Sequence, residues 1–126
     1  MKNKTEYPLD YDELIEMKDL PVVAIDQESF FTYANQMFED TYGWHSQEVV
    51  GRSVTTIMPE HMRNMHIIGF ARFLATEEPR LIGKPVPVKV LCKSGEIKDI
   101  ELYILNKKTN QAWEFAAILK PIKNKK

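Results

Sequence analysis

Cysteine is nearly absent from this chain, and so is any long apolar run. The 126 residues include a single cysteine, Cys92, which excludes an internal disulfide and fits a reducing compartment. No apolar run approaches the length of a membrane span, and the first residues lack the apolar stretch of a signal peptide. We therefore expect a cytoplasmic protein that folds without disulfides.

An excess of one charge is also missing. The 17 lysines and arginines balance 18 aspartates and glutamates, so bulk charge predicts neither direct nucleic-acid binding nor membrane binding. The chain also lacks the G-x-S-x-G, P-loop and dinucleotide-binding motifs that mark common enzyme classes. We expect the chain itself not to be an enzyme.

The length of the chain predicts one domain with short extensions. A chain of 126 residues lies within the usual size of a single domain. Residues 1–19 are expected to form an N-terminal extension with a helix over 11–17, which Asp10 would cap. Residues 20–122 would form the main domain, and 123–126 a basic tail or linker.

Hydrophobic periodicity predicts an α+β domain. Two short β-rich runs separated by four polar residues indicate a hairpin, and three later runs with alternating apolar residues indicate a meander. The expected strands are 20–25, 30–33, 86–92, 99–104 and 113–119. The expected helices of the main domain are 36–42, 46–51 and 59–76. A polar loop is expected over 106–111. This order predicts a five-stranded antiparallel sheet, with the short helices and one long helix packed on one face.

The long helix carries the best candidate site. Met62, His66, Gly69 and Phe73 recur at helical spacing, so they share one face, and Phe70 flanks them. This face and the inner face of the sheet would enclose a pocket, and Gly69 removes bulk one turn away from His66. A histidine that faces such a pocket ligates a metal or haem, or it is a core residue with a satisfied hydrogen bond. The residues alone leave both readings open.

Motifs spread over most of the chain resemble those of the PAS family of sensory domains. The resemblance covers residues 20–122 and rests on Ile25-Asp26, Tyr33-Ala34-Asn35, Tyr42-Gly43-Trp44, Glu48-Val49-Val50-Gly51-Arg52 and Gly95. It implies a signal-transduction module that binds a small ligand in an interior pocket, dimerises, or does both. The expected partners are a second copy of the chain and an effector in the same or a partner chain, namely a histidine kinase, a diguanylate cyclase or a transcription regulator.

The segment 57–86 resembles the haem-binding, oxygen-sensing branch of that family. Met58-Pro59-Glu60, Arg63 and His66 match, without a gap, the segment in which that branch carries its axial histidine. The resemblance therefore implies haem b as a candidate cofactor, with His66 as the ligand of the iron.

Further matches and one departure follow His66. Arg72 falls where that branch has an arginine near a haem propionate, Arg80 replaces a propionate-side histidine, and Ile82-Gly83 matches a distal motif. Val86 stands where the oxygen sensors carry the arginine that bonds bound oxygen, so the resemblance implies a haem that binds carbon monoxide or nitric oxide, or one whose iron has a second ligand from the protein. The candidate cofactor-binding residues are His66, Gly69, Phe70, Arg72, Arg80, Ile82, Gly83 and Val86.

Three functions remain open at this stage. The first is a sensory PAS domain with a small-molecule ligand, the second is a haem-b gas sensor through His66, and the third is a ligand-free interaction and dimerisation module. Flavin photochemistry is disfavoured because Cys92 falls in an expected strand, where a small buried apolar residue is the simpler reading.

Overall fold

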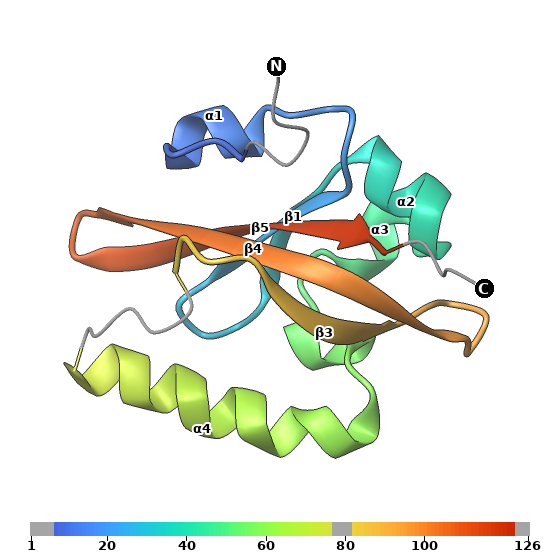
Figure 1. Ribbon diagram of the computed structural model, residues 1–126. Coiled ribbons are helices and arrows are strands. Elements are labelled where there is room, and N and C mark those ends of the chain that lie inside the picture. The colour runs from blue at the N-terminus through green and yellow to red at the C-terminus, as the bar shows by residue number, and fades with distance from the viewer. Residues whose placement is uncertain (1–6, 77–81, 123–126) are drawn as a thin grey trace.

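One antiparallel sheet of five strands organises the molecule. The computed structural model describes residues 7–76 and 82–122, and its strands lie in the order β2-β1-β5-β4-β3 (Figure 1). The strands are β1 (Val22–Asp26), β2 (Phe31–Ala34), β3 (Val86–Leu91), β4 (Ile97–Thr109) and β5 (Ala112–Pro121). The predicted sheet is confirmed, and β3, which carries Pro87 and follows Pro85, lies at the edge where a missing backbone donor is tolerated.

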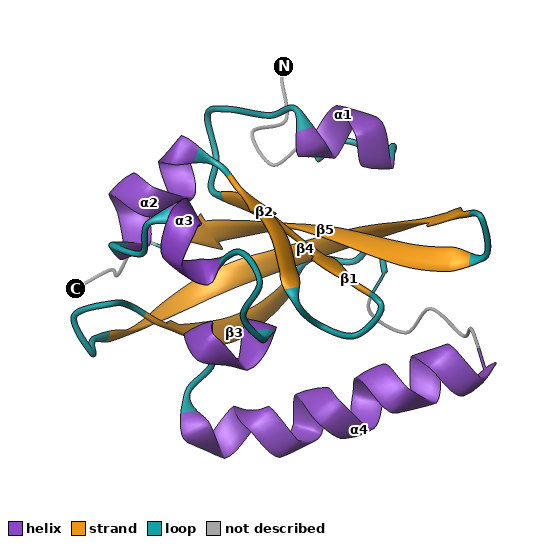
Figure 2. Cartoon of the chain, turned by 180° about the vertical axis from the view of Figure 1, so that it is seen from behind, coloured by secondary structure: helices purple, strands orange, loops and turns teal. Residues whose placement is uncertain are grey.

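The helices lie on both faces of this sheet. They are α1 (Tyr11–Ile15), α2 (Gln36–Tyr42), α3 (Ser46–Val49), a 3-10 turn η1 (Val54–Ile57) and the long α4 (Glu60–Thr76). Viewed edge-on, α1 lies above the sheet and α4 below it (Figures 1 and 2). None of the helices described within 7–76 and 82–122 is long and apolar enough to cross a membrane.

Strand alternation gives the sheet two separate cores. On β5, Ala117 and Leu119 pack in a cluster with residues of α2 and α3, whereas Ala116 and Ile118 belong to a cluster with Leu14 of α1. Successive side chains of a strand point to opposite faces, so one strand serves both cores. The expected N-terminal helix therefore covers the outer face of the sheet, and the other helices lie on the inner face.

The turn between β4 and β5 differs from the sequence expectation. The loop expected over 106–111 is a two-residue turn, because β4 continues to Thr109 and β5 begins at Ala112. Asn110 and Gln111 have φ values of 50° and 68°, the positive angles that two-residue hairpins require. Polar residues continue the strand here because cross-strand hydrogen bonds satisfy their backbone, and the polarity itself misled the prediction.

Smaller corrections concern element ends. The first helix ends at Ile15 rather than 17, although Asp10 caps it as expected by accepting a hydrogen bond from the backbone N–H of Glu13. Cys92 lies just after β3 rather than within a strand, but it is buried, as a small apolar residue would be. Gly43 ends α2 in the left-handed conformation, with a φ of 87°.

Candidate functional site

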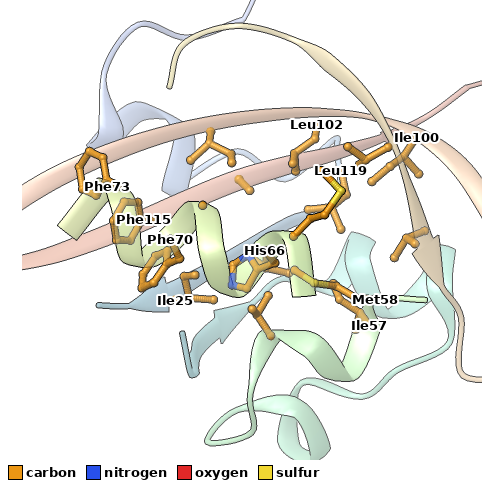
Figure 3. A pocket seen from close by; sticks show the side chains of 18 of the residues that line it. Ile25, Ile57, Met58, His66, Phe70, Phe73, Ile100, Leu102, Phe115 and Leu119 are labelled. Atoms are coloured by element: carbon orange, nitrogen blue, oxygen red, sulfur yellow. The ribbon is translucent and has the colours of Figure 1, made fainter. Parts of the chain in front are cut away.

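A cavity of about 550 Å³ lies between α4 and the inner face of the sheet. This volume lies within the range of cavities that hold small organic ligands in proteins. Figure 3 shows side chains from α4 and from the sheet directed into the space between them. The pocket that the sequence predicted between the long helix and the sheet is therefore present.

The two ends of the cavity differ in chemistry. Phe70, Phe73 and Phe115 gather at one end, and aliphatic side chains that include Ile100 and Leu119 line the other (Figure 3). The ring centroids of Phe70 and Phe73 lie 5.1 and 5.4 Å from that of Phe115. Phe73 also meets Trp113 edge-on at 5.1 Å, so aromatic contacts join the second half of α4 to β5.

The long helix stands over the cavity instead of sealing it. None of the residues of α4 is buried, and Met65 and Ile68 line the cavity although they are 76% and 62% exposed. Apolar side chains occur around most of the helix. It therefore lacks the single apolar face that would pack closely against the sheet. The cavity therefore opens to the outside along α4.

His66 is a half-buried polar side chain that α4 directs into this apolar space. Its Nε2 lies 3.2 Å from the Ser29 hydroxyl, and its ring stacks on Phe70 with centroids 5.5 Å apart. Burial lowers the pKa of His66, because an apolar environment disfavours the charged imidazolium. The ring is therefore held in its neutral form near neutral pH.

Ser29 is a partner that sequence reasoning missed. It lies in the turn between β1 and β2 with a φ of 71°, a conformation that costs a non-glycine residue free energy. Its backbone N–H donates to Asp26 and its carbonyl accepts from Val54, at 3.0 and 2.7 Å. No sequence pattern links this turn to His66, which lies far along the chain, so tertiary structure alone brings them together.

The cavity includes most of the candidate cofactor residues. His66, Gly69, Phe70, Arg72 and Ile82 line it, as do several residues that the sequence did not single out, among them Met65 and Phe115.

Two candidate residues and one member of the helix stripe lie outside the cavity lining. Gly83 and Val86 do not line the cavity, and Arg80 lies outside the described residues. Met62, which the periodicity placed on the cavity-facing stripe, is also outside the lining.

Haem fits these residues in part. A half-buried neutral imidazole and the guanidinium of Arg72 lie on one cavity, and a side chain added at Gly69 would meet open space. However, Nε2 of His66 already has the Ser29 hydroxyl as its partner, so iron coordination through this atom requires that contact to break. Within residues 7–76 and 82–122, no cluster of three or more His, Cys, Asp or Glu side chains is arranged to hold a metal ion.

Comparison with known proteins places the chain in a family. A sequence model described as the PAS fold matches residues 9–103. A protein of Azorhizobium caulinodans, described only as uncharacterized, is 29% identical over 105 residues, which is 82% of this chain and 14% of that protein. The chain therefore corresponds to only a small part of the length of this relative.

Solved structures of PAS domains share the fold. The PAS domain of a Desulfitobacterium hafniense protein has a TM-score of 0.69 at 18% identity, covering 87% of this chain and 99% of that one. A PAS domain from a two-component sensor histidine kinase has a TM-score of 0.67 at 11% identity, with coverages of 87% and 91%. At sequence identities this low, the structural similarity shows a shared fold and nothing more. The PAS sequence model matches most of the chain, and it indicates the same fold. This chain is a member of the PAS family, whose domains are sensory modules.

Proposed function

We propose that this PAS domain is a sensor that binds a small, mostly apolar molecule in the cavity under α4. The observation that carries the proposal is the cavity itself, with its volume of about 550 Å³, its apolar lining and one half-buried polar side chain, His66. Pockets with this balance favour ligands with an apolar body and few polar groups. Because the cavity opens along α4, its apolar walls face water, and a ligand that covers them and binds only the folded chain stabilises the fold.

A thermal unfolding screen with apolar ring and chain compounds, biphenyl among them, tests this proposal. Ala117 lies on the cavity wall, so Ala117→Phe would fill part of the space. Ala75→Phe adds the same ring to an exposed position of α4 outside the lining, and it serves as the matched control. We expect ligands to raise the unfolding midpoint of the wild type and of Ala75→Phe but not of Ala117→Phe. The proposal fails if no compound shifts the wild type.

Ligand binding in the cavity would change the structure or packing of the domain, and this change would regulate an effector in the same or a partner chain. The sheet supports this route, because β4 and β5 contribute side chains both to the cavity and to the core beneath α1. We also propose that the chain acts as a homodimer. Light scattering of the purified protein tests the dimer, and a monomer at every accessible concentration would contradict it.

A haem-b gas sensor is the second candidate, favoured by the position of His66 and Arg72 on the cavity. His66 would hold the iron and Arg72 a carboxylate of the haem edge, and the group would supply gas binding. Absorption spectra of protein produced with haem precursor test this function, with His66→Ala as the variant and His61→Ala as the control. A Soret band that His66→Ala alone abolishes would support it, and a colourless protein that takes up no added hemin would exclude it.

A further inference from the structure

Few polar groups line the cavity, and their placement restricts the ligand. Among the described residues of the lining, the polar side chains are His66, Arg72 and Lys89, and none is acidic. Lys89 is bound to Asp99 at 2.5 Å, and Arg72 is exposed. His66 is therefore the polar group that a molecule inside the cavity would meet away from bulk water.

The contact with Ser29 leaves one nitrogen of His66 open. Nε2 has the Ser29 hydroxyl as its partner, and no hydrogen bond joins Nδ1 to any residue of the described ranges. No buried side-chain nitrogen or oxygen in these ranges lacks a partner, so the unpartnered Nδ1 must be accessible. The Ser29 hydroxyl either donates to Nε2 or accepts from it, which leaves Nδ1 as a donor or an acceptor respectively.

The surroundings of this nitrogen disfavour a charged ligand group. His66 is half-buried among apolar side chains, and burial keeps its ring neutral, so the imidazole itself offers no charge to offset the desolvation of an ion beside it, while Arg72 and Lys89 lie at exposed positions of the lining. A hydroxyl group suits the site better, because it donates and accepts and so matches either tautomer of His66.

The shape of the neighbouring wall favours a planar body. Phe70 stacks on His66 and contacts Phe115, which in turn contacts Phe73, so rings from α4 and β5 form a continuous wall beside the His66 imidazole (Figure 3). Aromatic ligands gain offset-stacked and edge-to-face contacts on such a wall.

We propose that the cavity selects an uncharged aromatic molecule with a single hydroxyl-like group that hydrogen-bonds to His66 Nδ1, while Ser29 fixes the orientation of the imidazole. This inference rests on the proposed ligand-binding function and names the chemical class of its ligand.

Three probes with the same two-ring body separate the alternatives. Biphenyl carries no polar group, para-phenylphenol adds a neutral hydroxyl, and para-phenylbenzoate adds a carboxylate. We expect para-phenylphenol to bind about three- to tenfold more tightly than biphenyl, the effect of one net hydrogen bond. Para-phenylbenzoate should bind most weakly. Dissociation constants would come from calorimetry or from ligand-observed NMR.

Substitutions of two histidines on α4 test whether the hydroxyl group of the ligand hydrogen-bonds to His66. His66→Phe keeps an aromatic ring against Phe70 but removes both nitrogens, so para-phenylphenol should fall to the affinity of biphenyl. His61→Phe changes an exposed residue outside the lining and should keep the preference. In the wild type, the ¹⁵N signal of His66 Nδ1 should shift with para-phenylphenol and not with biphenyl, a readout that needs no substitution.

The possible outcomes separate the two proposals. Equal affinity for biphenyl and para-phenylphenol would overturn the hydrogen bond to His66, while the cavity would remain a ligand site. Tightest binding of para-phenylbenzoate, weakened by Arg72→Gln, would overturn the uncharged class in favour of an anionic ligand. Absence of binding by all three probes, joined to a failed thermal screen, would overturn the ligand-binding function itself.

Discussion

At the scale of single residues, Asn35 holds the first strands and α2 together. Its Oδ1 accepts hydrogen bonds from the backbone N–H groups of Val22 and Phe38 at 3.0 and 2.9 Å. Its Nδ2 donates to the carbonyls of Met17 and Leu20 at 3.1 and 2.9 Å. The sequence singled out Asn35 as part of a family motif, and the bonds that reach back to the N-terminal segment depend on tertiary structure. One buried amide thus satisfies backbone groups of three segments.

We expect Asn35→Ala to lower the free energy of unfolding by about 2–4 kcal/mol, because it removes a helix cap and leaves buried backbone groups unpaired. Asn64→Ala, at an exposed position of α4, should change it by less than about 1 kcal/mol. Urea unfolding followed by circular dichroism measures both. Equal effects of the two substitutions would show that the Asn35 bonds contribute little.

His66 should make stability depend on pH. Because burial lowers the pKa of His66 in the folded state, the unfolded chain binds a proton more readily than the folded chain. Stability therefore falls as the pH drops through about 6.5, the ordinary histidine value, until the folded state is protonated as well. His66→Phe should flatten this slope, and His61→Phe should keep it. Urea unfolding at several pH values checks this, and a slope unchanged in His66→Phe would contradict it.

At the scale of elements, α1 anchors the outer face of the sheet. Leu14 is fully buried against that face, whereas Leu9, just before the helix, is 89% exposed. The Tyr11 and Tyr103 hydroxyls also join the N-terminal segment to the sheet, through Glu114 and the Pro8 carbonyl. The sequence indicated this helix from its cap at Asp10, but it did not predict which surface the helix covers.

We expect Leu14→Ala to cost about 2–5 kcal/mol of stability, the usual range for a leucine removed from a core. Leu9→Ala is the matched control and should change stability by less than about 0.5 kcal/mol. Chemical unfolding measures both variants. If Leu14→Ala behaves like Leu9→Ala, α1 does not hold the sheet in solution.

The β4–β5 hairpin offers a stabilising substitution. Gln111 has a φ of 68°, which glycine adopts without strain. Gln111→Gly should therefore raise the free energy of unfolding by about 0.5–1 kcal/mol. Thr109→Gly, within β4, should lower it, because glycine weakens a strand. A thermal midpoint that falls in both variants would contradict the turn assignment.

At the scale of the whole molecule, local patterns predicted the fold better than the site. Alternation along 99–104 and 113–119 marked the inner strands, and the apolar run around His66 marked the long helix and its pocket. Contacts between distant segments were not predicted. The contact between Ser29 and His66 joins α4 to a turn that lies far from it in the sequence. Helical spacing alone placed Met62 on the cavity, and this placement was wrong. The pattern of the sequence records burial, but not which distant side chains meet.

An NMR titration of the isotope-labelled wild type with para-phenylphenol tests the central claim most directly. If the cavity under α4 is the ligand site, the shifted signals will include Gly69, Phe70, Phe115 and Leu119, and saturation will follow a single binding curve. Signals of exposed residues outside the lining, such as Leu9, would stay in place. Shifts confined to the outer face beneath α1, or no saturable shifts at any concentration, would contradict the account.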